Sequence, residues 1–232
     1  MGETMAKRTR DETRKLLLDV GIRLLYERGI HLGVTHIRLS DVVAAAGLTT
    51  GAAYRCWENQ DAFYRDLAAA ALLNREKMPV DDTIARIAPL VADGAPLAEV
   101  VRAGAEANLH RYPEDTAYLT KIALRVCGPA NDEMAEATQL RFRTSIDSYA
   151  GMYSEMLGVF GRRMRHPYTV RDLALSLTAL SEGFAVQAMS GTDHPRLERT
   201  DQAPGVGSDW TLFACGAEAI IDHFTEPIPH RD

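Results

Sequence analysis

The residue types best suited to chemistry lie together in GLTTGAAYRCW, residues 47 to 57. This stretch combines hydroxyl groups, a phenol and a guanidinium with very small residues. Such polar side chains reach phosphates or base edges, and the small residues let a backbone lie close to a groove. These residue types suit contacts to nucleic acid better than they suit bond making. The candidate contact residues of the stretch are Thr49, Thr50, Gly51, Ala52, Tyr54 and Arg55.

Motifs for catalysis or metal binding are absent from the sequence. It has no CxxC, HExxH, GxSxG or phosphate-binding glycine loop, and its seven histidines are scattered. Carboxylates such as Glu114, Asp115 and Glu136 are better explained as partners of helix dipoles. We expect no enzyme activity, no cofactor and no metal ion.

Composition points to a cytoplasmic protein with a substantial core. Of the 232 residues, 46% are hydrophobic and 25% are charged. The three cysteines, Cys56, Cys127 and Cys215, are far apart, which fits free thiols in a reducing compartment. No apolar run approaches the roughly 18 residues of a membrane span, so we expect no membrane partner.

Charge is unevenly distributed along the chain. The net charge is −6, yet residues 1–66 carry ten basic and nine acidic side chains. The acidity therefore lies in the remainder, which leaves the N-terminal part free to approach nucleic acid.

Helical signals recur throughout, and strand signals are nearly absent. Thr9 and Glu12 form a capping box for a first helix to about Arg28. Thr49 and Asn59 are placed to cap two later helices with their side chains. In the N-terminal part we expect a loop over 31–38, short helices over 39–46 and 50–57, and a helix from 59 to 77. Further on, Pro89 should kink or end a helix, and two long helices should follow over 129–163 and 169–190. A loop over 191–208 should then lead to a last helix, capped by Ser208.

The sequence thus predicts an all-α fold of roughly nine or ten helices. We expect an N-terminal domain over 1–78 and a larger helical domain over 79–232. Two short helices around Gly47 follow the helix-turn-helix plan, in which the glycine accepts a left-handed backbone and Thr49 caps the second helix. Ordinary packing of two short helices is an equally good reading of these dozen residues alone.

The residues that flank this stretch favour the DNA-binding interpretation over ordinary packing. The segment from Arg10 to Phe63 resembles the DNA-binding domain of the TetR family of transcriptional regulators. The matching landmarks are Arg28-Gly29, Asp41, Ala46-Gly47-Leu48, Gly51, Tyr54 and Trp57, followed by the acidic-apolar opening of the fourth helix. They cover about the first quarter of the chain, and the remainder shares only the general layout of a helical bundle.

Four positions depart from the family pattern. Ala53 replaces a bulky aliphatic residue, and Cys56 replaces an aromatic one. Gln60 stands where the family has a phosphate-binding lysine, and Arg38 replaces a threonine at the start of the second helix. We interpret Arg38 as a substitute phosphate contact, and we count Gln60 among the DNA-facing positions. Cys56 is either a redox-active thiol or, more simply, a small buried hydrophobe.

The resemblance implies a homodimer that binds a near-palindromic operator and responds to a small molecule. Two late helices with helical apolar spacing could form a four-helix dimer interface, or could equally be buried in one subunit's core. The interface candidates are Leu173, Leu177, Leu180, Phe184, Trp210, Phe213, Ala217, Ile220 and Ile221.

Aromatic and methionine residues of the C-terminal part could line an adaptable apolar ligand site, although plain core is the commoner role of such a stripe. The ligand candidates are His110, Tyr118, Phe142, Tyr149, Met152, Tyr153, Met156 and Phe184. The expected function is a ligand-responsive repressor released from operator DNA by an effector. The alternative is a helical ligand-binding or interaction module that has weak DNA affinity or none.

Overall fold

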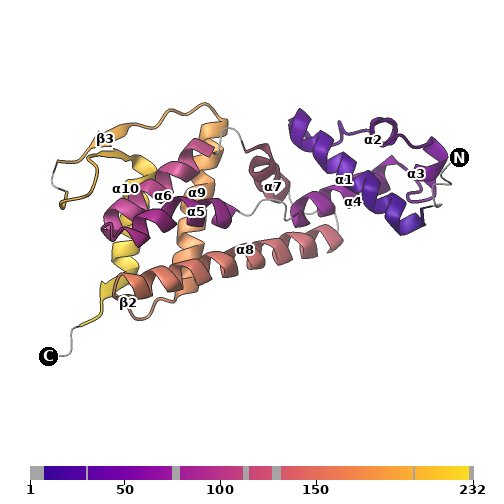
Figure 1. The fold of residues 1–232 in the computed structure, drawn as a ribbon. Coiled ribbons are helices and arrows are strands. Elements are labelled where there is room, and N and C mark those ends of the chain that lie inside the picture. The colour runs from indigo at the N-terminus through magenta and orange to yellow at the C-terminus, as the bar shows by residue number, and fades with distance from the viewer. Residues whose placement is uncertain are drawn as a thin grey trace, which may run out of the picture. The chain divides into compact units, whose positions relative to one another are not determined.

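The computed structural model describes residues 8–29, 31–74, 79–111, 115–126, 132–200 and 202–229, and helices dominate them (Figure 1). The helices are α1 (Arg10–Arg28), α2 (Leu39–Ala45), α3 (Thr50–Tyr54), α4 (Gln60–Leu73), α5 (Pro79–Ala92), α6 (Leu97–Arg111), α7 (Thr116–Val126), α8 (Asp132–Val159), α9 (Val170–Met189) and α10 (Leu212–Phe224). The strands are β1 (His31–Val34), β2 (Arg162–Met164), β3 (Arg196–Glu198), β4 (Asp209–Thr211) and β5 (Thr225–Pro227).

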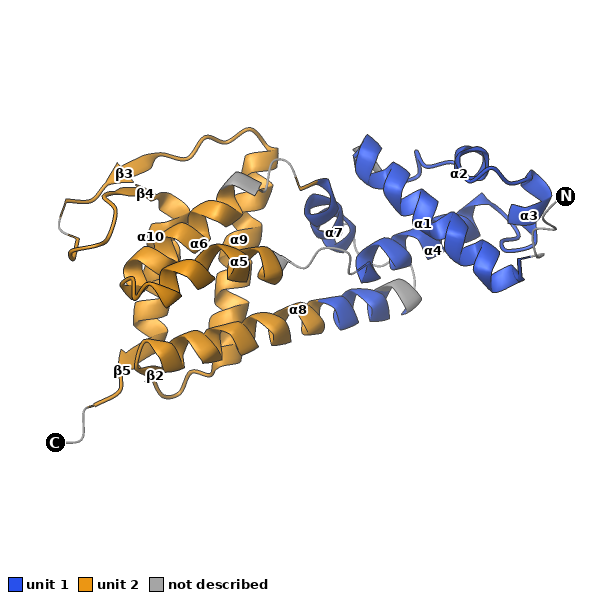
Figure 2. Cartoon of the chain, viewed as in Figure 1, with its two compact units in different colours: residues 1–74, 116–141 blue, residues 75–115, 142–232 orange. Residues whose placement is uncertain are grey.

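The chain divides into two compact units (Figure 2). Unit 1 comprises Met1–Asn74 and Thr116–Arg141, and unit 2 comprises Arg75–Asp115 and Phe142–Asp232. The boundary expected at residues 78 and 79 lies just after the first piece of unit 1. The second piece, which contains α7 and the start of α8, had no signal in the sequence that assigned it to the N-terminal unit.

Helix α1 begins as its sequence predicts. The Thr9 hydroxyl accepts a hydrogen bond from the Glu12 N–H at 3.2 Å, and the Glu12 carboxylate accepts one from the Thr9 N–H at 2.8 Å. This capping box satisfies two amides that have no partner inside the helix. The pKa of Glu12 lies below its usual value, chiefly because of the hydrogen bond from the Thr9 backbone. The helix ends at Gly29, whose φ of 75° is left-handed.

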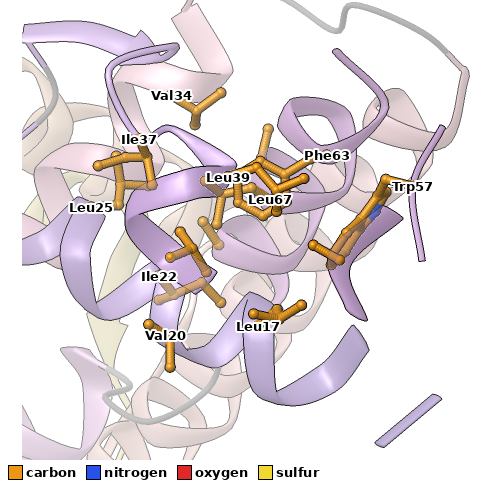
Figure 3. Packing of buried hydrophobic residues seen from close by; sticks show 14 of the residues in the cluster. Leu17, Val20, Ile22, Leu25, Val34, Ile37, Leu39, Trp57, Phe63 and Leu67 are labelled. Atoms are coloured by element: carbon orange, nitrogen blue, oxygen red, sulfur yellow. The ribbon is translucent and has the colours of Figure 1, made fainter. Parts of the chain in front are cut away.

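The core of unit 1 forms between α1, α2 and α4 (Figure 3). Leu17 and Leu25 of α1 are fully buried, and so are Phe63 and Leu67 of α4. Gly21 allows the close approach of these two helices, because a Cβ on it would lie 2.9 Å from Leu67 Cδ1. The helices that could bear a binding surface are therefore mounted on a packed apolar base.

Helices α2 and α3 are joined by a tight turn at Gly47, whose φ of 64° favours glycine. The helix-turn-helix plan is present, but two details of the expectation are wrong. Thr49 stands at the N-cap position of α3 and makes no side-chain capping hydrogen bond; its carbonyl instead accepts from the Ala52 N–H at 2.9 Å. Helix α3 also ends at Tyr54 rather than near Trp57, because the chain turns there to enter the core.

Helix α4 supports the start of α2. Asn59 caps α4 as expected, its side chain accepting from the Ala62 N–H at 2.9 Å. The next residue, Gln60, reaches across and accepts the Leu39 N–H of α2 at 3.0 Å. Arg38, the N-cap residue of α2, makes no side-chain capping bond. Gln60 therefore supplies, from another helix, the capping contact that Arg38 does not make.

Unit 2 is built from α5, α6, α9, α10 and the C-terminal part of α8. Helix α6 packs against both α5 and α10, and α10 also packs against α9. Thr169 and Asp172 form the predicted capping box at the start of α9. Pro89 lies inside α5 and was expected to kink or end it; the helix ends about one turn later, at Ala92.

The short strands were not predicted. Strand β2 pairs antiparallel with β5, and β3 pairs antiparallel with β4. The β3–β4 pair lies in and beside the expected loop 191–208, and β1 lies in the expected loop 31–38. Each paired strand has three residues, which is too short for an alternating pattern to be recognised. The β4 strand runs directly into α10, so Thr211 caps that helix in place of the expected Ser208.

An ionic network holds the β3–β4 hairpin against α6. Glu99 accepts from Arg102 at 2.6 Å and from the Gly207 N–H at 2.9 Å. Arg196 of β3 pairs with both Glu106 and Asp209. The hydrogen bond from Arg102 holds the pKa of Glu99 below its usual value. At the centre of the hairpin, Trp210 is fully buried.

The cross-helix cap predicts a stability effect. Gln60→Ala leaves the Leu39 N–H without its acceptor, and it should lower the free energy of unfolding by about 1 kcal/mol. Urea unfolding followed by circular dichroism measures this change. Gln60→Glu is the matched control, because it keeps an oxygen acceptor and should unfold close to the wild type. An alanine variant as stable as the glutamate variant would contradict the capping role.

Candidate functional site

Helix α3 has two distinct faces. Ala52 and Ala53 point inward, and Ala53 is fully buried. Four residues later, Cys56 and Trp57 are buried on the same side. Residues spaced by four lie on one face of a helical turn, so this spacing accounts for the inner face. Ala53, at the position where the family resemblance implies a bulky aliphatic residue, therefore places a small side chain in the core of unit 1.

The outer face of α3 carries the polar residues of GLTTGAAYRCW. Thr49, Thr50, Gly51 and Arg55 are exposed, and Tyr54 is 60% exposed. A Cβ built on Gly51 meets nothing within 4 Å, so its backbone is open to an approaching partner. Of the predicted contact residues in this stretch, the structure places five on the surface and turns Ala52 inward.

Arg38 and Gln60 differ in availability. Arg38 is exposed at the start of α2. Gln60 is partly buried, and its side-chain oxygen is engaged by the Leu39 N–H. The side-chain amide of Gln60 bears no charge and is oriented toward α2. The structure thus gives Gln60 a structural partner at the position where the family resemblance implies a phosphate-binding lysine.

Part of the predicted ligand set comes together in unit 2. Tyr149, Met152, Tyr153 and Met156 of α8 join one apolar cluster with residues of α5 and α6, among them Ile87. The rings of Tyr149 and Tyr153 stack at a centroid distance of 6.0 Å. Burial raises the pKa of Tyr153 well above its usual value. The cluster has the aromatic and methionine composition of adaptable apolar sites.

The other ligand candidates lie elsewhere. Phe184 packs in a second cluster, with its ring 5.2 Å from Phe213 and 4.6 Å from His194. Phe142 is half-buried near the middle of α8, and Tyr118 is half-buried on α7, which belongs to unit 1. The side chain of His110 lies outside the described part of the chain.

Comparison with known proteins gives structural matches only. No protein-family model matches the sequence, and no curated protein matches it. A protein from Rhodococcus sp. RHA1 described as a transcriptional regulator is 16% identical, over 76% of this chain and 86% of that one, with a TM-score of 0.56. The reduced form of NemR from E. coli is 17% identical, over 77% of this chain and 88% of that one, with a TM-score of 0.50.

A TetR-family transcriptional regulator from Streptomyces coelicolor is also similar, with 18% identity over 92% of this chain and 96% of that one, and a TM-score of 0.44. The chain shares the fold of the Rhodococcus regulator and of NemR.

Within this fold, most of the predicted dimer residues are already covered by their own chain. Six of the nine are buried in unit 2, and Leu180, Ile220 and Ile221 are half-buried. Leu180 contacts Gly216 of α10, since a Cβ there would lie 3.2 Å from Leu180 Cδ2. The buried six are Leu173, Leu177, Phe184, Trp210, Phe213 and Ala217.

Sequence reasoning missed the exposed faces of the last two long helices. We call these residues the outer stripe; they are Leu175, Ala179, Gly183 and Val186 of α9, and Leu212 and Ala219 of α10. All six are exposed in the single chain, and all are apolar or small. The steps of three and four along α9 and of seven along α10 were available from the sequence, but burial was needed to separate this stripe from the inner one.

No helix in the described part of the chain is both long and apolar enough to cross a membrane. Among the same residues, no three His, Cys, Asp or Glu side chains gather where they could hold a metal ion.

Cys56 sits in the apolar interior beneath α3. Its thiol lies 3.6 Å from the Ala52 carbonyl and 3.7 Å from the Arg10 carbonyl, as a weak donor to both. Burial raises the pKa of the Cys56 thiol above its usual value. A high thiol pKa lowers the reactive thiolate fraction, which disfavours the redox reading. Cys215 of α10 is half-buried, and Cys127 lies outside the described residues.

These environments predict different thiol reactivities. Iodoacetamide should label Cys56 at least about tenfold more slowly than Cys215 in the folded protein, because reaction requires an accessible thiolate. Peptide mass spectrometry after timed quenching measures both rates. Labelling in denaturant is the control, where the two rates should converge. Faster labelling of Cys56 in the folded protein would restore a reactive role for it.

Proposed function

We propose that this chain is a cytoplasmic, ligand-responsive transcriptional repressor. It binds a near-palindromic operator as a homodimer, and a small-molecule effector releases it from the DNA. In this proposal residues 1–78 contain the DNA-binding part, and residues 79–232 contain the effector and dimer functions. The fold shared with the Rhodococcus regulator, together with the resemblance of residues 10–63 to the TetR family, supports the class of function, and the individual residues rest on their chemistry and placement.

One observation carries the proposal: the polar outer face of α3, set on the second helix of a helix-turn-helix. Tyr54 and Arg55 project from it, with Thr50 and Gly51 one turn earlier. A helix that enters the major groove reads bases with such side chains, while neighbouring hydroxyls and backbone amides contact phosphates. Arg38 is a second exposed cation, at the start of α2.

The effector region is proposed around Tyr149, Met152, Tyr153 and Met156. Their cluster is the part of the ligand set that the fold brings together. Stacked rings and flexible thioethers favour a planar or apolar effector over a highly charged one. The effector must bind the DNA-competent and released conformations with different affinity, because equal affinity would shift no equilibrium.

The homodimer is proposed to form through the outer stripe. Ala179, Gly183 and Ala219 are small enough to let helices of two subunits approach closely, and Leu175, Val186 and Leu212 add apolar surface. Two helices from each subunit then make a four-helix interface. This arrangement leaves the buried apolar residues of α9 and α10 in the core of each subunit.

One feature favours the alternative, a helical binding module with little DNA affinity. Gln60 is engaged with Leu39, and its uncharged amide cannot form an ion pair with a phosphate. The DNA-binding experiment distinguishes the two functions directly.

The purified chain should select specific fragments from a genomic library and bind them in a salt-dependent way. Arg38→Ala should weaken binding to all fragments. It should also reduce the slope of log affinity against log salt concentration by about one, the contribution of one phosphate contact. Tyr54→Ala should cost about 1–3 kcal/mol and relax sequence preference. Fluorescence anisotropy at two salt concentrations, with a scrambled fragment alongside, measures both effects.

Arg86→Ala, which removes an exposed charge from α5, is the matched control and should bind as the wild type does. Equal, weak binding of every fragment by the wild type would refute the repressor and favour the alternative. A selected complex then serves to screen small molecules for release of the DNA.

The outer stripe predicts the effect of a charge in the dimer interface. Ala179→Glu should weaken dimerisation by at least about 100-fold, because burial of an unpaired carboxylate costs several kcal/mol. Sedimentation equilibrium measures the dissociation constant, and circular dichroism checks that the monomer stays folded. Ala85→Glu, the same change at an exposed alanine of α5, should leave the dimer intact. An undisturbed Ala179→Glu dimer would place the interface elsewhere.

A further inference from the structure

We propose that Asp66 is a positioning residue that sets the orientation of α3 through Trp57, and thereby sets the sequence selectivity of the chain. This inference rests on the proposed function and deepens it. It concerns two side chains that lie behind the candidate DNA-facing surface rather than on it.

The carboxylate of Asp66 joins three elements of unit 1. Its Oδ2 accepts hydrogen bonds from Arg14 of α1, at 3.1 Å from Nε and 2.6 Å from Nη2. The same oxygen accepts the indole N–H of Trp57, just beyond the end of α3. Asp66 itself lies on α4, so one oxygen atom links α1, α4 and the segment that follows α3.

Packing and a backbone hydrogen bond fix Trp57, so that a shift of its ring would also shift α3. Its side chain is 4% exposed, and its ring meets Phe63 edge-on at a centroid distance of 5.1 Å (Figure 3). Its backbone N–H donates to the Ala53 carbonyl of α3 at 3.1 Å. A rotation of the indole therefore acts directly on the last turn of α3, which bears Tyr54 and Arg55.

Helix α3 depends on such external contacts. Its five residues form little more than one turn, and Thr49 makes no side-chain cap at its start. The opposite end of the helix-turn-helix is also tied to α4, by Gln60 to Leu39 and by the Tyr64 hydroxyl to the Thr35 carbonyl at 2.5 Å. Asp66 supplies the polar contact at the α3 end, where the side chains for base reading begin.

Neither residue of this pair is on the binding surface. The Asp66 side chain is 15% exposed, and Trp57 is nearly covered. Removal of the indole–carboxylate bond changes neither the outer face of α3 nor, in Trp57→Phe, the charge. Phosphate contacts tolerate small displacements, whereas base contacts require accurate geometry. Loss of the bond should therefore reduce selectivity and spare non-specific binding.

The experiment compares Trp57→Phe, Asp66→Asn and the double variant with the wild type. Trp57→Phe keeps an aromatic ring beside Phe63 and removes the donor together with part of the buried ring volume, and Asp66→Asn tests the same bond without that loss of volume. We expect Trp57→Phe to lower the ratio of selected-fragment to scrambled-fragment affinity by about tenfold, with the scrambled-fragment affinity and its salt slope unchanged. The effects of Trp57→Phe and Asp66→Asn on the affinity ratio should add less than fully in the double variant, since the indole–carboxylate bond that they share is lost only once.

Asp19→Asn is the matched control, since it neutralises an exposed aspartate of α1 and should keep the wild-type ratio. Circular dichroism at the assay temperature establishes that each variant is folded. A purely structural role would lower the melting temperature and leave the affinity ratio of the folded protein unchanged, which would overturn the inference. If the wild type selects no DNA at all, the proposed function fails and this inference fails with it. A wild type that selects DNA, with Trp57→Phe keeping the ratio, overturns this inference alone.

Discussion

The candidate DNA-facing surface depends on one constraint: a five-residue helix cannot hold its own conformation. Such a helix has at most one or two internal hydrogen bonds, and its formation is unfavourable without packing. Helix α3 gains that packing through Ala53 and through Cys56 and Trp57 just beyond its end, which enter the apolar core of unit 1. Its outer face is then free to carry polar residues, because no stability is required from them.

Helix α4 has a role beyond its apolar face. Polar side chains along it contact the start of α2, the loop before α2 and the end of α3. These contacts explain two departures from the family pattern together. Arg38 provides no cap for α2, and Gln60 provides it instead. Gln60, at the position where the family resemblance implies a phosphate-binding lysine, has a structural role, and Arg38 presents an exposed charge.

In unit 2, helices α9 and α10 each have one buried face and one exposed face. The inner faces of α9 and α10 complete the core, and the outer stripe remains uncovered in the single chain. The hairpin between these helices is fastened to α6 by charged side chains and by a buried tryptophan. Arg102 and Glu99 satisfy each other and nearby backbone groups, and these hydrogen bonds offset part of the cost of removing the two charges from water.

The sequence by itself determined the helical class, the capping boxes at Thr9 and Thr169, the turn at Gly47 and the polar composition of residues 47 to 57. These features follow from local rules, since caps, turns and helical periodicity depend on residues within one or two turns of each other. The tertiary structure alone decided that Gln60 caps another helix, that Asp66 joins three elements, that three-residue strands pair, and that the buried faces of α9 and α10 differ from the outer stripe. These outcomes depend on which residues meet across long stretches of chain. Periodicity shows that a helix has an apolar face, but only packing shows whether that face is buried within its own chain.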